Sequence, residues 1–165
     1  MSERPVYVAV CGSGVADADA ATIAEEVGRL LAHEGAVLVC GGLGGVMEAA
    51  ARGAAEAGGT SIGILPGPDR SGQARDLTWS IPTGMGEARN ALVVRASDAL
   101  IAVGGEFGTL SEIALAVKLG VPVVGLRTWE LAKAGAPVEA FEAAEDPAEA
   151  VHLALRGANR RARPS

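Results

Sequence analysis

The sequence is poor in the side chains that carry most metal and cofactor chemistry. Its 165 residues include only two cysteines, two histidines and two lysines. Cys11 and Cys40 are too few for a disulfide framework and too far apart for the ligand spacing of a zinc site. Lys118 falls late in a predicted helix, so no lysine is well placed to form a Schiff base with pyridoxal phosphate. The sequence therefore argues against a disulfide scaffold, a zinc protein and a pyridoxal enzyme, and we expect no metal site.

Aromatic residues and long apolar runs are also scarce. Aromatics make up 3% of a sequence that is 49% hydrophobic, which predicts an aliphatic core. No apolar run reaches about 18 residues, and the N-terminus lacks a basic region followed by an apolar stretch, which argues against a membrane span and a secretory signal. The net charge of −6 makes the chain a poor general binder of nucleic acid. We therefore expect a soluble, cytoplasmic protein with neither membrane nor nucleic-acid partners.

Glycine, by contrast, is abundant, with 23 residues clustered between segments that alternate between strand and helix patterns. Predicted strands cover 5–11, 36–40, 60–65, 99–103 and 121–126, with a short extended piece at 79–81 and an edge-like strand at 138–144. Predicted helices cover 17–34 (capped by Asp17 or Asp19), 46–57, 87–96, 109–119 and 146–155. This alternation predicts βαβ units with right-handed crossovers, interrupted by one long loop at 66–76.

The fold class follows from this order of elements. We predict an α/β fold, a Rossmann-like, doubly wound parallel sheet of about six or seven strands with helices on both faces. Residues 1–156 are predicted to form a single nucleotide-binding domain. Residues 157–165, which contain Arg160, Arg161 and Arg163, are predicted to form a basic flexible tail.

Three glycine turns follow predicted strands, at 12–14, 41–45 and 104–108. Because the carboxyl ends of parallel strands meet at one edge of a sheet, we expect these turns to converge on one cleft. Backbone amides at glycine turns and helix starts suit an anion, most often a phosphate. None of the turns completes a dinucleotide-binding fingerprint, and no P-loop sequence occurs, so neither NAD binding nor NTP hydrolysis is indicated.

Charged residues beside these turns are the candidate site side chains. Glu112 lies one turn into the helix after 104–108, where its carboxylate could face a ligand. The spacing of Thr109 and Glu112 equally fits a capping box that satisfies helix-start amides. Arg89 is the best-placed cation, because the planar guanidinium of arginine binds two phosphate oxygens at once. Glu48 begins the second helix much as Glu112 begins its own.

Two stretches of the sequence resemble a known family. Residues 41–48, with Gly58-Gly59 and 64–66, resemble the GGGxxGLMG region of the LOG ("lonely guy") superfamily, and 97–112 resembles its PGGxGTxxE motif. Members are often mislabelled lysine decarboxylases, an activity that we do not expect here. Within that superfamily, residues 83–90 are most similar to the subgroup of molybdenum cofactor carrier proteins.

The resemblance implies two functions. A carrier-like protein would bind a phosphorylated nucleotide-like or pterin ligand in the glycine-rich cleft. The LOG enzymes are instead nucleoside 5′-monophosphate phosphoribohydrolases, which cleave the N-glycosidic bond to release the free base and ribose 5-phosphate. Their catalytic arginine and glutamate fall on Arg89 and Glu112. This chain differs from those enzymes at Gly104 (proline there), at Glu106 (glycine there) and in lacking the histidine and lysine around Arg89.

The sequence also gives predictions for the ligand, the oligomeric state and the residues of the site. No cofactor is required, and the bound molecule is expected to be a nucleotide, phosphate or the molybdenum cofactor. The protein is expected to be a homodimer or higher homo-oligomer, as is common in the superfamily. Besides Arg89 and Glu112 as catalytic residues of an enzyme, the predicted ligand-binding residues are Gly12, Ser13, Gly14, Gly41, Gly42, Gly44, Gly45, Met47, Glu48, Met85, Arg89, Asn90, Gly104, Gly105, Phe107, Gly108 and Thr109.

Overall fold

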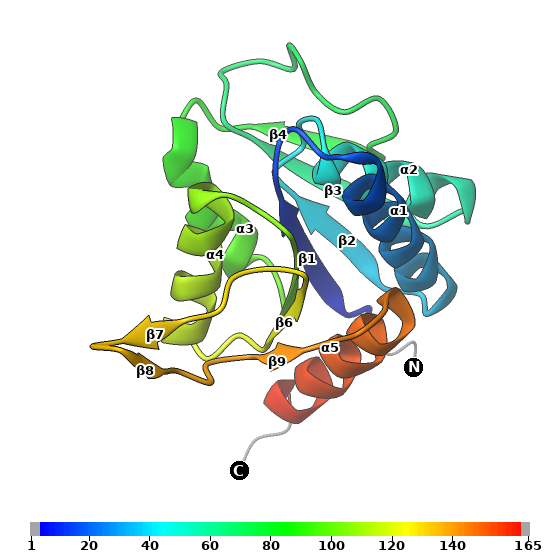
Figure 1. The fold of residues 1–165 in the computed structure, drawn as a ribbon. Coiled ribbons are helices and arrows are strands. Elements are labelled where there is room, and N and C mark those ends of the chain that lie inside the picture. The colour runs from blue at the N-terminus through cyan, green and yellow to red at the C-terminus, as the bar shows by residue number, and fades with distance from the viewer. Residues whose placement is uncertain (1–3, 163–165) are drawn as a thin grey trace.

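The computed structural model describes residues 4–162 and forms a seven-stranded parallel sheet with helices on both faces (Figure 1). The strands run in the order β4-β3-β2-β1-β5-β6-β9. Their bounds are β1 Tyr7–Gly12, β2 Val37–Cys40, β3 Thr60–Leu65, β4 Trp79–Pro82, β5 Ala99–Val103, β6 Val123–Leu126 and β9 Glu142–Ala143. A separate antiparallel pair, β7 Ala132–Lys133 and β8 Ala136–Pro137, projects from the sheet. The predicted fold class is confirmed.

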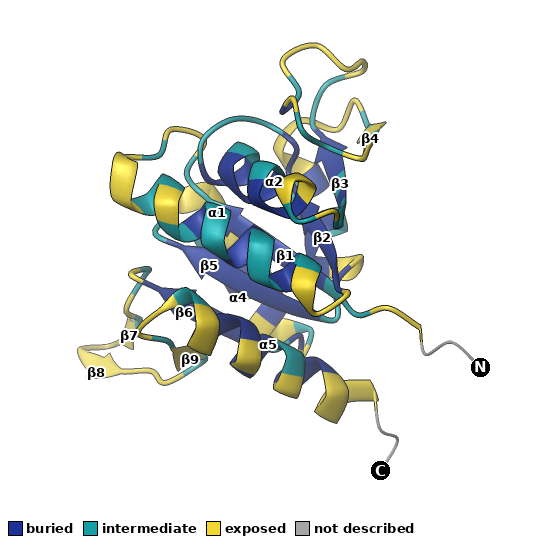
Figure 2. Cartoon of the chain, turned by 90° about the vertical axis from the view of Figure 1, so that its right-hand side faces the viewer, coloured by how far each residue is buried: buried dark blue, intermediate teal, exposed yellow. Residues whose placement is uncertain are grey.

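The helices divide between the two faces as a doubly wound fold requires. One face carries α1 Ala18–His33, α2 Val46–Glu56 and α5 Pro147–Ala162. The other carries α3 Asn90–Arg95 and α4 Phe107–Lys118, with the 3₁₀ turn η1 Gly86–Arg89 leading into α3. The side chains of β1 alternate between the two faces of the sheet. Val8 and Val10 pack in the core on the side of α1, α2 and α5, and Ala9 and Cys11 pack in the core on the side of α3 and α4. Figure 2 shows the central strands as a buried layer between helices with exposed outer surfaces.

The aliphatic core lets α1 and α2 pack unusually close together. A Cβ atom added to Gly53 of α2 would lie 1.9 Å from the Glu25 carbonyl oxygen, and one added to Gly28 of α1 would lie 2.0 Å from the Ala50 carbonyl oxygen. Both neighbours are backbone atoms of the facing helix, so neither contact can be relieved by rotating a side chain. These two glycines therefore set the distance between α1 and α2.

We expect Gly53→Ala to lower the free energy of unfolding by about 2 kcal/mol, the usual cost of overpacking a core. Helix propensity alone predicts the opposite, since alanine stabilises a helix interior by roughly 1 kcal/mol relative to glycine. Urea unfolding of the variant measures the sign. Gly67→Ala, in the loop after β3, is the control for an added methyl group without a close contact, because the nearest atom to its added Cβ is 3.8 Å away. A Gly53→Ala protein as stable as the wild type would contradict the close packing of α1 on α2.

Helix starts and ends follow local side-chain signals in some places and packing in others. Asp17, and not Asp19, caps α1, with its Oδ1 accepting from the Ala20 amide at 2.7 Å. Asp146 accepts from the Glu149 amide at 2.8 Å at the start of α5, as predicted. The strand predicted at 138–144 is wrong in length, because only β9 pairs with β6. The helix predicted at 87–96 is a 3₁₀ turn followed by the short α3.

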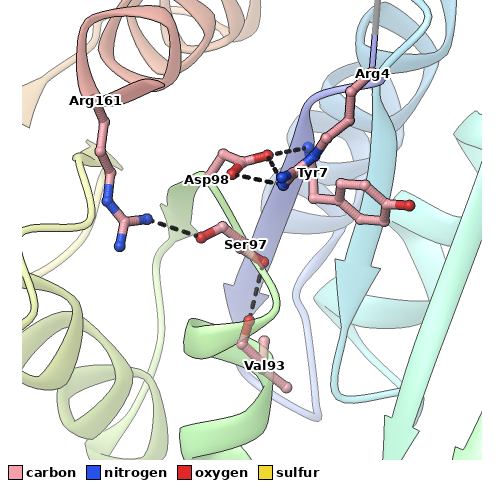
Figure 3. A network of polar contacts seen from close by, with 6 residues as sticks. All are labelled: Arg4, Tyr7, Val93, Ser97, Asp98 and Arg161. Atoms are coloured by element: carbon pink, nitrogen blue, oxygen red, sulfur yellow. Dashed lines mark hydrogen bonds and ion pairs between the residues drawn. The ribbon is translucent and has the colours of Figure 1, made fainter. Parts of the chain in front are cut away.

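The C-terminal segment corrects the prediction of a flexible tail over residues 157–165. Helix α5, predicted to end near Leu155, continues to Ala162, with Gly157 and Ala158 buried. In the last turn of α5, Arg161 donates to the Ser97 carbonyl oxygen at 3.3 Å (Figure 3). The neighbouring Asp98 accepts from Arg4 and from the Tyr7 amide, which holds the segment before β1 at the same place. Residues 163–165 of that prediction lie outside the described part of the chain. Within residues 4–162, none of the helices has the length and apolar character needed to cross a bilayer.

Candidate functional site

A cleft of about 460 Å³ lies at the carboxyl edge of the sheet, where β1 and β5 are neighbours. After β1 the chain passes to α1 on one face, and after β5 it passes to α4 on the other. This divergence opens a crevice between the two turns, as is general for doubly wound sheets. Gly12, Gly41 and Gly108 all line the cleft, so each of the three glycine turns contributes to it.

The cleft contains about half of the predicted site residues and several others. The predicted residues that line it are Gly12, Gly41, Met47, Arg89, Asn90, Phe107, Gly108, Thr109 and Glu112. The lining residues that the sequence analysis missed are Val10, Cys11, Leu43, Pro66, Glu87 and Ser111. In the sequence, Cys11 was considered only as one of two cysteines that form neither a disulfide framework nor a zinc site. Its place directly before Gly12 indicates the carboxyl edge of the sheet but not the face on which its side chain lies.

Other predicted glycines shape the turns without lining the cleft. A Cβ atom added to Gly45 would lie 2.2 Å from the Ser13 carbonyl oxygen, which also accepts from the Val46 amide at 3.0 Å. The first and second glycine turns therefore pack directly on each other. The predicted residues outside the cleft lining are Ser13, Gly14, Gly42, Gly44, Gly45, Glu48, Met85, Gly104 and Gly105.

Gly104 and Gly105 belong to a neighbouring, smaller hollow of about 360 Å³. Glu106, Arg127, Thr128 and Trp129 form the rest of its lining. The Thr128 hydroxyl donates to the Gly104 carbonyl oxygen at 2.5 Å and ties the turn after β5 to the turn after β6. Glu106, whose charge conflicts with phosphate binding in the turn after β5, is exposed and lines this hollow instead of the cleft.

Arg89 carries the positive charge of the cleft and is only 8% exposed. Its Nη2 donates to the Gly41 carbonyl oxygen at 3.2 Å, and its Nη1 donates to Asn90 Oδ1. Its Nε is buried without a hydrogen-bond partner, and within residues 4–162 no carboxylate forms an ion pair with it. A buried cation held only by neutral groups is costly unless an anion joins it.

Glu112 lies across the same cleft and is 6% exposed. Burial raises the pKa of its carboxyl to about 7, although a hydrogen bond from the Cys11 thiol and the charge of Arg89 both act to lower it. Burial, and then the charge of Glu112, raises the pKa of the Cys11 thiol well above its usual value, so the thiol remains protonated and able to donate. The carboxyl of Glu112 can therefore be either protonated or ionised near neutral pH.

The start of α4 does not form the capping box that the spacing of Thr109 and Glu112 left open as an alternative. Its N-cap is Glu106, which makes no side-chain capping hydrogen bond, and Thr109 lies inside the first turn with 3% exposure. The N-cap of α2 is Gly45, which likewise provides no side-chain cap. By contrast, aspartates cap α1 and α5. Helices α2 and α4, whose first turns both contribute residues to the cleft, thus have no side-chain acceptor at their N-caps, which suits an anionic ligand.

The cleft combines one buried cation, Arg89, with one buried carboxyl, Glu112, whose pKa of about 7 lies near neutrality. Asn90 connects the arginine to α4, since its Nδ2 donates to Ser111 Oγ at 3.5 Å and Ser111 donates to the Gly108 carbonyl oxygen at 2.6 Å. Over residues 4–162, no group of three or more His, Cys, Asp or Glu side chains is arranged to hold a metal ion.

Comparison with known proteins is consistent with this architecture. The model of the SLOG cluster4 family matches residues 5–154. A protein of Archaeoglobus fulgidus is 44% identical over 151 residues, which cover 91% of this chain and 95% of that protein.

Two solved structures are similar over nearly their whole length. The molybdenum cofactor binding protein from the phototrophic bacterium Rippkaea orientalis has a TM-score of 0.84 and 35% identity, covering 94% of this chain and 98% of that one. The Moco carrier protein from Chlamydomonas reinhardtii has a TM-score of 0.82 and 34% identity, covering 95% and 99%.

Proposed function

Because this chain belongs to the SLOG cluster4 family, we propose that it binds a small phosphorylated ligand of the molybdenum cofactor type in the cleft between β1 and β5. The observation that carries the proposal is the buried guanidinium of Arg89, which has an unpartnered Nε and no carboxylate in ion-pair contact within the described chain. A phosphate oxygen would supply the missing acceptor and the missing charge. Similar proteins named as binding or carrying the molybdenum cofactor support a ligand of this type.

Binding would draw on three groups of this chain. Arg89 would contact phosphate through its guanidinium, and the first-turn amides of α4 would add neutral donors aligned with the helix dipole. Glu112 would adjust the charge of the cleft, because its protonated form removes the repulsion between a carboxylate and the ligand. The nucleotide, phosphate or molybdenum cofactor enters as cargo, so no resident cofactor is required.

A second candidate function rests on Glu112. A carboxyl with a pKa of about 7 can give or take a proton at neutral pH, which is the requirement for a general acid or base. Cleavage of an N-glycosidic bond builds positive charge on the ribose, and a nearby carboxylate stabilises that charge. A LOG-type phosphoribohydrolase would therefore use Glu112 at the ribose or the attacking water, with Arg89 orienting the 5′-phosphate. The histidine and lysine of the LOG enzymes are absent from residues 86–90.

The two functions make different predictions for nucleoside monophosphates. We expect calorimetric binding of a phosphorylated ligand without release of ribose 5-phosphate when the purified protein is incubated with AMP and other monophosphates. Release that is lost in Glu112→Gln and retained in the matched surface variant Glu130→Gln would instead establish the phosphoribohydrolase. If no monophosphate, pterin phosphate or inorganic phosphate binds, the proposed site is wrong.

The remaining expectations on partners and location continue as proposals. We propose a homodimer or higher homo-oligomer, because the edge strand β4 exposes Trp79 by 61% and Ile81 by 52%. Apolar side chains on an open sheet edge favour association with a second chain. The lack of a nucleic-acid partner and the cytoplasmic location stay predictions from the composition.

A further inference from the structure

An exposed aromatic side chain borders the cleft. Phe107, the first residue of α4, lines the cleft and is 75% exposed. Its ring centroid lies 5.4 Å from that of Trp129, with the ring planes tilted by 44°. The whole sequence has two tryptophans, two phenylalanines and one tyrosine, so two of its five aromatic residues meet here. An exposed ring supported by a second ring is a surface on which a flat heterocycle can stack.

The residue before Phe107 adds a carboxylate that the protein does not use internally. Glu106 lines the hollow that contains Trp129, and it makes no side-chain capping bond at the start of α4. Arg127 lines the same hollow, but its ion pair is with Asp19, at 3.7 Å, and within residues 4–162 Glu106 has no ion pair. The Phe107–Trp129 pair therefore lies between a phosphate-binding cleft and a carboxylate that accepts hydrogen bonds.

The backbone around Glu106 has an unusual conformation. Gly104 and Gly105 have φ angles of +53° and +106°, and Arg127 has φ +50°, which is strained for a residue with a side chain. The hydrogen bond from Thr128 to the Gly104 carbonyl oxygen links the two turns. The loops that carry Glu106 and Trp129 are thus held together, which makes the hollow a preformed surface.

We infer that Phe107 and Glu106 form a subsite for the 2-amino-4-oxopyrimidine ring that guanine and pterin share. A carboxylate is an acceptor only, with two oxygens side by side. This ring presents two neighbouring donors in its plane, the ring N–H and the exocyclic amino group, which match those oxygens. With the ring stacked on Phe107 and the phosphate at Arg89, both ends of one ligand are bound. The inference rests on the proposed function, since it assigns the second half of the same ligand.

The same geometry explains why a negative charge is tolerated beside the glycine turn. The LOG phosphoribohydrolases, to which this chain is similar, have glycine at the position of Glu106. A carboxylate there would repel phosphate if it pointed into the cleft. Because Glu106 lines the neighbouring hollow, its charge is available to the donor edge of a ring. Adenine presents a ring acceptor beside its amino group, and hypoxanthine lacks the amino group, so both would pair less well.

Calorimetric titration with GMP and IMP tests the subsite, because these nucleotides differ only by the 2-amino group. We expect GMP to bind the wild type about tenfold or more tightly than IMP, the usual effect of a hydrogen bond to a charged acceptor. Glu106→Gln, which keeps the size of an exposed side chain, should bring the ratio of the two affinities close to one. Phe107→Leu should weaken both nucleotides and leave their ratio unchanged. Glu130→Gln, a nearby exposed carboxylate outside both linings, is the matched control and should behave as the wild type.

Other ligands distinguish the phosphate site from the ring subsite, and a pterin from a guanine nucleotide as the source of the ring. Inorganic phosphate should bind the wild type and Glu106→Gln equally. If phosphate binds both proteins equally and the wild type binds GMP and IMP with the same affinity, the ring subsite is wrong and the phosphate site stands. If phosphate and every nucleotide fail to bind, the proposed function itself is wrong. Tighter binding of 6-hydroxymethylpterin phosphate than of GMP would support a pterin ligand, and the reverse order a guanine nucleotide.

Discussion

Replacing Arg89 with alanine is expected to weaken the binding of inorganic phosphate by about 1–3 kcal/mol, or roughly 5- to 150-fold. Arg89 is the buried cation of the cleft, and its Nε has no partner within the described chain. The loss should be large because the variant removes both the charge and the planar pair of donors. Titration calorimetry at constant pH and low salt measures it directly.

Two companion variants separate this effect from a general loss of charge or stability. Arg95→Ala removes an exposed arginine at the end of α3 that does not line the cleft, and phosphate binding should be unchanged. Arg89→Met keeps an unbranched apolar stem without the guanidinium and its charge, and it should unfold in urea no more easily than the wild type, since a buried unpaired cation is removed. Phosphate binding that is equal in the wild type and Arg89→Ala would remove Arg89 from the ligand site.

Replacing Glu112 with glutamine is expected to raise the free energy of unfolding by about 3 kcal/mol at pH 8. The pKa of this carboxyl is about 7 in the folded protein, and about 4.3 in an unfolded chain. Between these values the folded state keeps a proton that the unfolded state has lost. The free energy of unfolding therefore falls as the pH rises between these two pKa values. Above pH 7 the whole destabilisation by the buried, ionised carboxylate is present. Glutamine carries no charge and avoids that cost.

The sign of the pH dependence is the decisive measurement. At pH 4.5 the carboxyl is protonated in the folded state and partly protonated in the unfolded state, so Glu112→Gln should differ from the wild type by less than about 1 kcal/mol. Urea unfolding at pH 4.5, 6 and 8 should show the gap widening with pH. Glu130→Gln should show no such trend. A constant difference across this range would mean that Glu112 is not desolvated in the cleft. A substitution in the cleft that stabilises the folded protein is expected where the native residue is kept for function at a cost in stability.

The architecture could be predicted in detail because its signals are local. Strands β1, β2 and β5 are short aliphatic runs that end at or directly before a glycine, and the helices α1, α2 and α4 that follow them show their own apolar spacing. The order of elements and the parallel sheet follow from this pattern. Boundaries were less predictable where packing decides them. Helix α5 continues past Leu155 because Gly157 and Ala158 pack inward and Arg161 reaches Ser97, contacts that no local pattern specifies.

The candidate site was predicted in outline, through the resemblance and the three turns. Arg89 and Glu112 do face one cleft, and each turn contributes a glycine to it. The capping box, the alternative that the spacing of Thr109 and Glu112 left open, does not form, because α4 begins two residues earlier, at Phe107. Cys11 was missed because an apolar strand residue gives no sign of which face of the sheet it occupies until the neighbours of that strand are known.

The α/β class, the glycine turns at the carboxyl edge of the sheet and the place of Glu112 one turn into the helix after Gly108 follow from the sequence alone, because strand, turn and helix signals lie within a few residues of one another. Only the tertiary structure decided what those residues face. The burial that raises the pKa of Glu112 comes from the packing of α4 on the sheet beside Cys11. The exposure of Glu106 outside the cleft comes from the two turns that meet at Thr128. Solvation and charge in the site depend on neighbours distant in the sequence, and for that reason they appear only in the folded chain.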